Sequence, residues 1–236
     1  MSIPSTSNAI TPDARLLRRA ASPRVFGALL LSLCVLPGCG YTGGQLLYFL
    51  GVGKGQLIPA EFKLTSEPVL ILVDDPGERI DWPPARAHIQ DELAAELIAQ
   101  KAAVKIIPRA TLEGLRQTRS DFDKRGAREI GELAGADQVI WLEIRSFLAD
   151  EQISDATTAA YVGTSVKVLN AREDESRSRV RLWPTSPEGR PVSVSLPGDA
   201  VARLKTRDAI SRELAKKLAV DITRLFHEHR LDDFGK

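Results

Sequence analysis

The chain has 236 residues, of which 43% are hydrophobic and 27% are charged, and its formal net charge is +1. These proportions are those of an ordinary globular protein, so they exclude a largely disordered chain and a membrane protein with many spans. The length favours one compact domain.

The first 38 residues have the order of segments that is typical of a bacterial export signal. Four arginines precede an apolar run that extends from Val25 to Leu36. This run has about 12 residues, which fits the core of a signal peptide and is short of the roughly 20 residues that a membrane-spanning helix needs. We therefore predict a signal peptide at 1–38 rather than a permanent transmembrane helix.

The end of this signal resembles the lipobox of bacterial lipoproteins, with Leu36, Pro37 and Gly38 before Cys39. The resemblance implies cleavage between Gly38 and Cys39, and lipid attachment, including palmitate, on the Cys39 thiol. Lipid chains of this kind hold a protein firmly on a membrane. The alternative is a plain secretory signal with an incidental cysteine. Gly40 is not the aspartate that retains many lipoproteins in the inner membrane, so we expect the outer membrane, with the inner membrane as the alternative.

The mature chain of about 198 residues is long enough to bury its own core. Cys34 lies in the signal peptide, so no thiol is left for a disulfide, a nucleophile or a metal site. Removing 1–38 leaves 28 basic and 30 acidic residues, a net charge of about −2. This balance gives no electrostatic support for binding nucleic acid.

Residues 39–63 are predicted to be a lipid-anchored linker, and 64–236 a periplasmic domain. The linker includes the apolar segment Leu46–Leu50, which is too short to span a bilayer. Gly51–Gly55 looks like part of a phosphate-binding loop but lacks its spacing, so we do not expect a nucleotide there.

Strands and helices alternate in the first half of the domain. The continuous apolar run 68–73 is typical of a strand buried on both faces. Apolar periodicity and proline positions predict the following elements: a helix at 83–101, a strand at 104–107, helices at 111–117 and 125–134, and a strand at 137–147. This order favours parallel strands joined by helical crossovers.

The pattern then changes to strands alone. Segments 158–170, 179–183 and 192–196 predict an antiparallel meander, and a last helix at 206–229 carries an apolar stripe that includes Leu214 and Leu218. The predicted fold class is α/β: one mixed sheet with parallel βαβ units, an antiparallel meander, and helices packed on it.

Three segments resemble the α/β domain shared by the N-terminal part of TolB, CsgG and LpoB. They are the strand Val69–Val73, the segment Val104–Arg109, and above all Glu129–Ile140, which contains Gly-Ala-Asp at a helix-to-strand turn. The resemblance implies a lipid-anchored domain that faces the periplasm, binds other envelope proteins and has no chemistry of its own. The chain lacks the long amphipathic hairpins of the CsgG pore, so we do not expect a pore.

The resemblance therefore favours a protein-binding module that acts as an envelope assembly or scaffold factor. The sequence contains no catalytic motif of the hydrolase, zinc-protease or dinucleotide-binding kind, so we expect no enzyme and no cofactor. A homo-oligomer is compatible with the sequence. The alternative is a periplasmic small-ligand sensor or enzyme with its site near Asp74 and Asp75.

Few residues stand out as candidate contacts. Asp74 and Asp75 follow the first strand, at the edge where α/β domains place ligand groups, although a turn-forming role is also open. Trp82 and Trp183 each lie next to a proline-marked element end, where they contact a partner or pack internally. We predict no metal site, because His227 and His229 are spaced for different helix faces, and we expect His88 on the surface.

Overall fold

The computed structural model describes residues 57–150, 160–173 and 177–230. They belong to one unit, Gly55–Lys236, whereas Met1–Lys54 forms another. The predicted signal peptide, the lipobox with Gly38 and Cys39, the segment Leu46–Leu50 and residues 39–56 of the predicted linker therefore lie outside the described residues. Among the described residues, no helix is both long enough and apolar enough to cross a bilayer.

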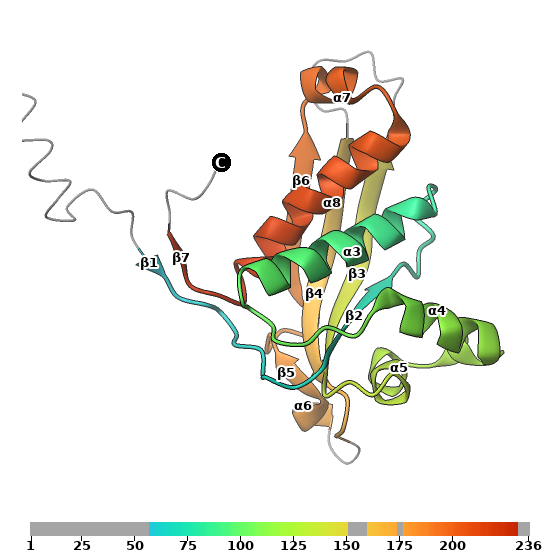
Figure 1. Ribbon diagram of the computed structural model, residues 1–236, viewed down its shortest axis with the longest axis vertical. Helices are drawn as coiled ribbons and strands as arrows, with labels where there is room; N and C mark the ends of the chain where they lie inside the picture. The colour runs from blue at the N-terminus through green and yellow to red at the C-terminus, as the bar shows by residue number, and fades with distance from the viewer. Residues whose placement is uncertain (1–56, 151–159, 174–176, 231–236) are drawn as a thin grey trace, which may run out of the picture. The chain divides into compact units, whose positions relative to one another are not determined.

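A five-stranded sheet forms the centre of the domain (Figure 1). Strand β2 (Val69–Asp74) runs parallel to β3 (Gln138–Ala149), and β3 pairs antiparallel with β4 (Ala160–Asn170). The other side of β4 pairs with two strands, β5 (Arg181–Trp183) and β6 (Arg190–Leu196). The predicted fold class, a mixed sheet with a parallel unit followed by antiparallel strands, is confirmed.

The antiparallel part differs from the predicted meander in one respect. Strand β5 pairs with Val168 and Leu169 of β4, and β6 pairs with the preceding stretch from Ala160 to Val166. The two strands therefore follow one another along the same side of β4 and are not neighbours in the sheet. The prediction of a strand at 179–183 was partly wrong, because Arg177–Val180 forms the short helix α6 before β5 begins.

Two long helices, α3 (Pro84–Ala99) and α8 (Arg207–Thr223), cover one face of the sheet and lie side by side (Figure 1). Their apolar side chains recur every three or four positions, as a helix with one buried face requires. Those buried side chains include Ile89, Leu93 and Leu97 of α3, and Ile210, Leu214, Leu218 and Ile222 of α8. The apolar stripe predicted for the last helix is confirmed. Ile98 of α3, by contrast, is 47% exposed.

Smaller helices cover part of the opposite face. Leu70 and Leu72 of β2 contact a second apolar cluster that α4 (Arg109–Thr118), the 3-10 turn Phe122–Lys124 and α5 (Ala127–Leu133) supply. Strand β2 is thus buried on both faces, which is why its sequence is apolar at every position up to Val73. This arrangement fixes the end of β2 between α3 and α4.

Two further predicted elements are corrected, and one helix was not predicted. The strand predicted at 104–107 is a single bridge between Ile106 and Val69, because Pro108 cannot donate to a ladder and already starts α4. The last helix ends at Thr223 and not at 229, since the chain turns back into strand β7 (His229–Arg230). Helix α7 (Gly198–Leu204), which precedes α8, was not predicted.

The start and the end of the described chain meet. Strand β1 (Leu57–Ile58) pairs with β7, and the amides of Glu61 and Phe62 donate to the Leu225 carbonyl. Glu61 also forms an ion pair with Arg190 of β6 at 2.8 Å. Residues 57–63, which were predicted to be the end of the linker, therefore pack on the domain.

Candidate functional site

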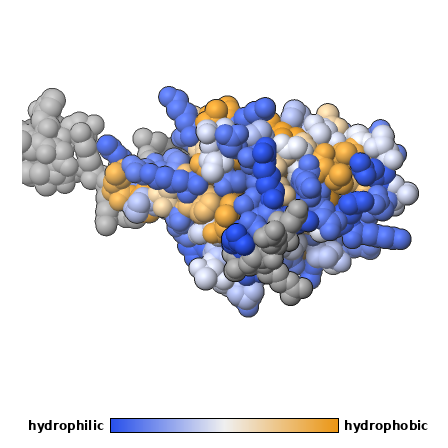
Figure 2. Space-filling model, turned by 90° about the horizontal axis from the view of Figure 1, so that it is seen from below, coloured by the Kyte–Doolittle hydropathy of each residue, from blue (hydrophilic) through white to orange (hydrophobic). Residues whose placement is uncertain are grey.

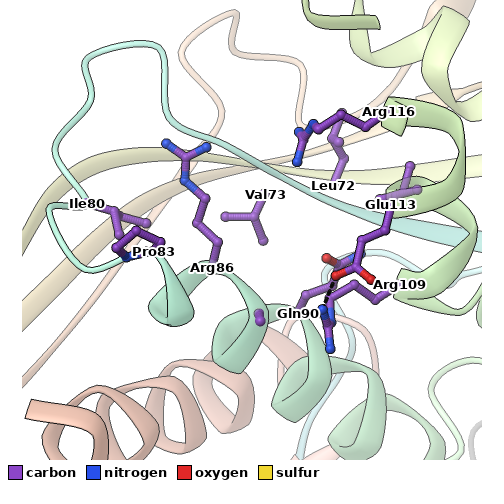
Figure 3. Close-up of a pocket in the computed structure, with 11 residues that line it drawn as sticks. Leu72, Val73, Ile80, Pro83, Arg86, Gln90, Arg109, Glu113 and Arg116 are labelled. Carbon is purple, nitrogen blue, oxygen red and sulfur yellow. Dashed lines mark hydrogen bonds and ion pairs between the residues drawn. The ribbon is translucent and has the colours of Figure 1, made fainter. Parts of the chain in front are cut away.

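The carboxyl end of β2 opens into a groove between α3 and α4, shown in Figure 3. Its volume is about 400 Å³, and its walls include Val73 of β2, Arg86 and Gln90 of α3, and Arg116 of α4. We call this pocket the β2 groove. A further pocket of about 740 Å³ lies beside it, lined by Asp74 and Asp75, and it shares Arg86 and Arg116 with the groove. The surface seen in Figure 2 is mainly hydrophilic, with smaller apolar patches.

The floor of the groove is an unpaired strand edge. The amide of Val69 donates to the Lys105 carbonyl, and the Val69 carbonyl accepts from the Ile107 amide. The peptide groups of Val69 therefore point away from β3. Because peptide groups alternate along a strand, those of Ile71 and Val73 point to the same edge. The Ile71 carbonyl accepts from the Gln90 side chain at 2.8 Å. On this edge, no described residue forms a hydrogen bond with the amide or the carbonyl of Val73.

Three arginines surround this edge. Arg86 pairs with Asp75 at 3.2 Å, Arg109 with Asp91 at 3.0 Å, and Arg116 with Asp123 at 3.5 Å. Arg109 also pairs with Glu113, and Arg116 lies over the Phe122 ring at 5.0 Å. Each arginine side chain is between 34% and 54% exposed. A guanidinium carries five donors, so these side chains keep free donors for a further acceptor.

Asp75 is a structural acceptor, not a free carboxylate. Its side chain is fully buried and accepts from the amides of Arg79 and Ile80, each at 2.9 Å, and from Arg86. Burial by itself raises the pKa of this carboxyl, but the two amides and the guanidinium outweigh it, so the pKa lies below its ordinary value. The turn-forming role that the sequence left open is thus the role that the structure shows for Asp75.

Asp75→Ala is expected to lower the free energy of unfolding by about 1–3 kcal/mol at pH 7, because three donors lose their acceptor. A carboxyl with a lowered pKa stabilises the fold above its unfolded pKa and loses that contribution as the pH falls through the folded value. The difference between wild type and Asp75→Ala in urea unfolding should therefore persist down to about pH 4 and shrink below it, since the ordinary value is 3.8. A difference that grows on acidification would contradict this role.

Asp74 lies on the other side of the strand and takes part in a second polar cluster. It accepts from the Trp141 indole at 3.2 Å, and the Lys167 ammonium lies 4.5 Å from the centre of the Trp141 ring. Lys167 also pairs with Glu143 at 3.3 Å. Trp141 is only partly buried and packs against the apolar cluster of the small helices.

The two candidate tryptophans are packed within the domain. Trp183 lies between Phe62 and Phe226, with ring centres 6.3 and 5.9 Å away, which is the internal packing that the sequence allowed as one of two roles. Trp82 lies under Arg207, whose guanidinium carbon is 5.5 Å from the ring centre. Neither ring lines the β2 groove.

The sequence suggested that His88 lies on the surface, but in the structure it lies between α3 and α8. Its Nδ1 lies 3.2 Å from the Ser211 hydroxyl, and its Nε2 lies 3.3 Å from an Asp208 carboxylate oxygen. Serine, histidine and aspartate in this order resemble a hydrolytic triad. Ser211, however, is only 1% exposed and lines none of the pockets described here, so a substrate has no path to it and the contacts join the two helices.

The other two histidines are also placed differently from the prediction. His227 follows the end of α8 and contacts the Thr223 carbonyl, and His229 lies in β7 and contacts the His227 carbonyl, so they are not exposed on one helix end. The described residues contain no group of three or more His, Cys, Asp or Glu side chains placed to hold a metal ion.

Comparisons with known proteins find only distant structural likeness. No family model and no curated protein matches the chain. Lipoprotein GNA1162 from Neisseria meningitidis is 15% identical, with a TM-score of 0.35, over 56% of this chain and 82% of that one. The PelC dodecamer from Paraburkholderia phytofirmans is 13% identical, with a TM-score of 0.37, over 74% of this chain and 99% of that one.

Hypothetical protein CT253 from Chlamydia trachomatis is a further neighbour, with 12% identity and a TM-score of 0.34, over 67% of this chain and 96% of that one. Likeness at these levels says nothing of what this chain binds. It also gives no support to kinship with the TolB, CsgG and LpoB group, which stays a prediction.

Proposed function

We propose that the chain is a lipid-anchored, periplasm-facing module that binds another envelope protein through the β2 groove and serves as an assembly or scaffold factor. The observation that carries this proposal is the unpaired edge at Val73, which lies in a groove surrounded by Arg86, Arg109 and Arg116. An open strand edge is a ready site for pairing with another chain. Charged side chains around it select the partner and its orientation.

The lipobox supports the anchoring part of the proposal. Cys39 precedes Leu57, the first described residue of the domain, by about 18 positions, and a fully extended chain covers at most about 3.3–3.6 Å per residue. The domain therefore works within roughly 60 Å of the membrane face. That distance keeps it among the proteins of the envelope, and Gly40 favours the outer membrane.

The alternative, a small-ligand sensor or enzyme at Asp74 and Asp75, has less support from the geometry. The Asp75 carboxylate already accepts hydrogen bonds from three donors, and the Asp74 carboxylate accepts one from Trp141. Neither carboxylate is thus held ready for a substrate, although both line the larger pocket.

Arg116→Glu is expected to reduce recovery of the partner about tenfold or more, which corresponds to about 1.4 kcal/mol of lost interaction. The measurement is affinity purification of the lipidated chain from cells treated with a reversible crosslinker, followed by quantitative mass spectrometry. Because the ion pair of Arg116 with Asp123 is exposed and its contact with the Phe122 ring is a partly exposed cation–π contact, the fold should lose little stability.

Arg203→Glu is the matched control. Arg203 is also an exposed arginine in an ion pair, with Asp199 at 2.6 Å, but it lies on α7 and does not line the groove. A partner whose recovery falls equally with both variants, or with neither, would contradict binding through the β2 groove.

A further inference from the structure

We propose that the β2 groove receives an extended peptide segment with acidic side chains, which adds to the free edge of β2 as a short strand. This inference rests on the proposed function and names the class of its partner. Strand addition of this kind derives affinity from main-chain hydrogen bonds and specificity from side-chain pockets. The β2 groove offers both.

The pairing position is Val73. Its amide and carbonyl point away from β3, as those of Val69 do, and no described residue bonds them. Val73 is 9% exposed and lines the groove, whereas Ile71 is fully buried and its carbonyl is occupied by Gln90. An incoming strand can therefore exchange two hydrogen bonds with Val73, and the Gln90 side chain marks where this pairing ends.

The groove continues beyond Gln90. An apolar cavity of about 280 Å³ shares Gln90 and Arg109 with it and is lined by Ala94, Ile98 and Ile106 among others. Ile98 is 47% exposed at this place. An extended chain that passes Gln90 would cover this side chain, so the cavity supplies an apolar subsite next to the pairing position.

The free donors of the arginines decide which peptide fits. The groove is lined by Arg86, Arg109 and Arg116 and by one acid, Glu113. Each arginine is already in an ion pair, but it is partly exposed and keeps free N–H donors. In Figure 3, Arg86 of α3 and Arg116 of α4 lie on the two sides of Val73. A guanidinium binds a carboxylate through two parallel hydrogen bonds, so Asp or Glu side chains that flank the paired residue match this geometry.

A second copy of the chain is a poorer occupant. Pairing two β2 edges would place the arginines of one copy against those of the other, whose carboxylates are already engaged in ion pairs, so the free guanidinium donors would gain no acceptor. A helical or basic peptide is also disfavoured, because the former has no free peptide groups for Val73 and the latter offers no carboxylate to the guanidinium donors. The acidic, extended segment is the occupant that meets both the hydrogen-bonding and the charge requirements.

The test uses the full lipidated chain in detergent, labelled with ¹⁵N-valine, and a blocked heptapeptide of sequence Thr-Asp-Val-Thr-Val-Asp-Thr. We expect the peptide to slow hydrogen exchange of the Val73 amide about tenfold or more. The amide of Val139, which lies in the central strand β3, should not change. The Val73→Ile variant assigns the signal of the Val73 amide, because that signal is absent from the spectrum of the variant.

Two altered peptides and two variants separate the contributions. N-methylation of the central residue blocks strand pairing and should weaken binding about tenfold, and lysine in place of both aspartates should abolish it. Arg116→Glu should weaken the acidic peptide about tenfold, whereas Arg203→Glu should not.

Binding that leaves Val73 exchange unchanged, or that survives N-methylation, would overturn strand addition. So would protection of Val73 that rises with protein concentration in the absence of peptide, which would place a second copy on the edge. If the acidic peptide fails to bind up to its solubility limit, this inference is wrong. The proposed function is tested separately, by whether Arg116→Glu reduces the recovery of a partner from cells.

Discussion

Cys39→Ala is expected to remove the protein from the lipoprotein pathway altogether. The thiol of Cys39 is the only acceptor for lipid in the lipobox, and the lipoprotein peptidase cuts only before a modified cysteine, so an uncleaved precursor should accumulate. Metabolic labelling with a radioactive or alkyne-bearing fatty acid measures the change directly. We expect a labelled wild-type band of the mature size and no label in the variant.

Cys34→Ala is the control for this substitution, since Cys34 lies within the apolar run of the predicted signal peptide. It should be labelled, cleaved and sorted as the wild type is. Fatty-acid label that persists in Cys39→Ala would disprove the lipobox, and a mature-sized soluble product from the same variant would favour the plain secretory signal.

Leu218→Ala is expected to destabilise the domain by about 2–5 kcal/mol, and Leu97→Ala by a similar amount. Both side chains are fully buried where α8 and α3 pack on each other and on the sheet, so truncation leaves a cavity that rigid neighbours cannot fill. Urea unfolding of the mature chain without lipid, followed by circular dichroism, gives the change in the free energy of unfolding.

Leu57→Ala serves as the comparison, because Leu57 is 57% exposed in β1. Its substitution should change stability by no more than about 0.5 kcal/mol. Midpoints for Leu218→Ala and Leu97→Ala that match this control would show that the two helices do not form the main core.

The elements that the sequence predicted well are those with a long, regular apolar pattern. Strand β2 has no polar residue before Asp74, and α8 repeats its apolar residues over 17 positions. Short elements were predicted poorly because their patterns are ambiguous. Val104 is apolar yet 72% exposed, and only Ile106 of the strand expected at 104–107 forms a bridge.

The site was predicted only in outline. The sequence located Asp74 and Asp75 at the carboxyl end of β2, but not that Asp75 would be enclosed by the turn that follows it. The three arginines of the β2 groove were not predicted as site residues, because a charged residue on a helix is usually interpreted as solvent-exposed. One signal was present: Arg109 and Arg116 are seven residues apart, which places both on one face of α4.

Contacts between distant segments were beyond the sequence patterns. His88 and Ser211 meet because α3 and α8 pack side by side, and Trp183 meets Phe62 because the chain before β2 folds back on the domain. Both are properties of tertiary packing, and periodicity within one segment carries no information about them.

The proposed function is tested most directly by a photoreactive amino acid placed at position 87 of the full-length chain in living cells. Ala87 lines the β2 groove and its replacement leaves the three arginines in place, so irradiation should join the chain to one discrete envelope protein in the membrane fraction. The same amino acid at position 203, on α7, should give no such product. Equal products from both positions, or none from position 87, would contradict the claim that this domain binds a partner through the edge of β2.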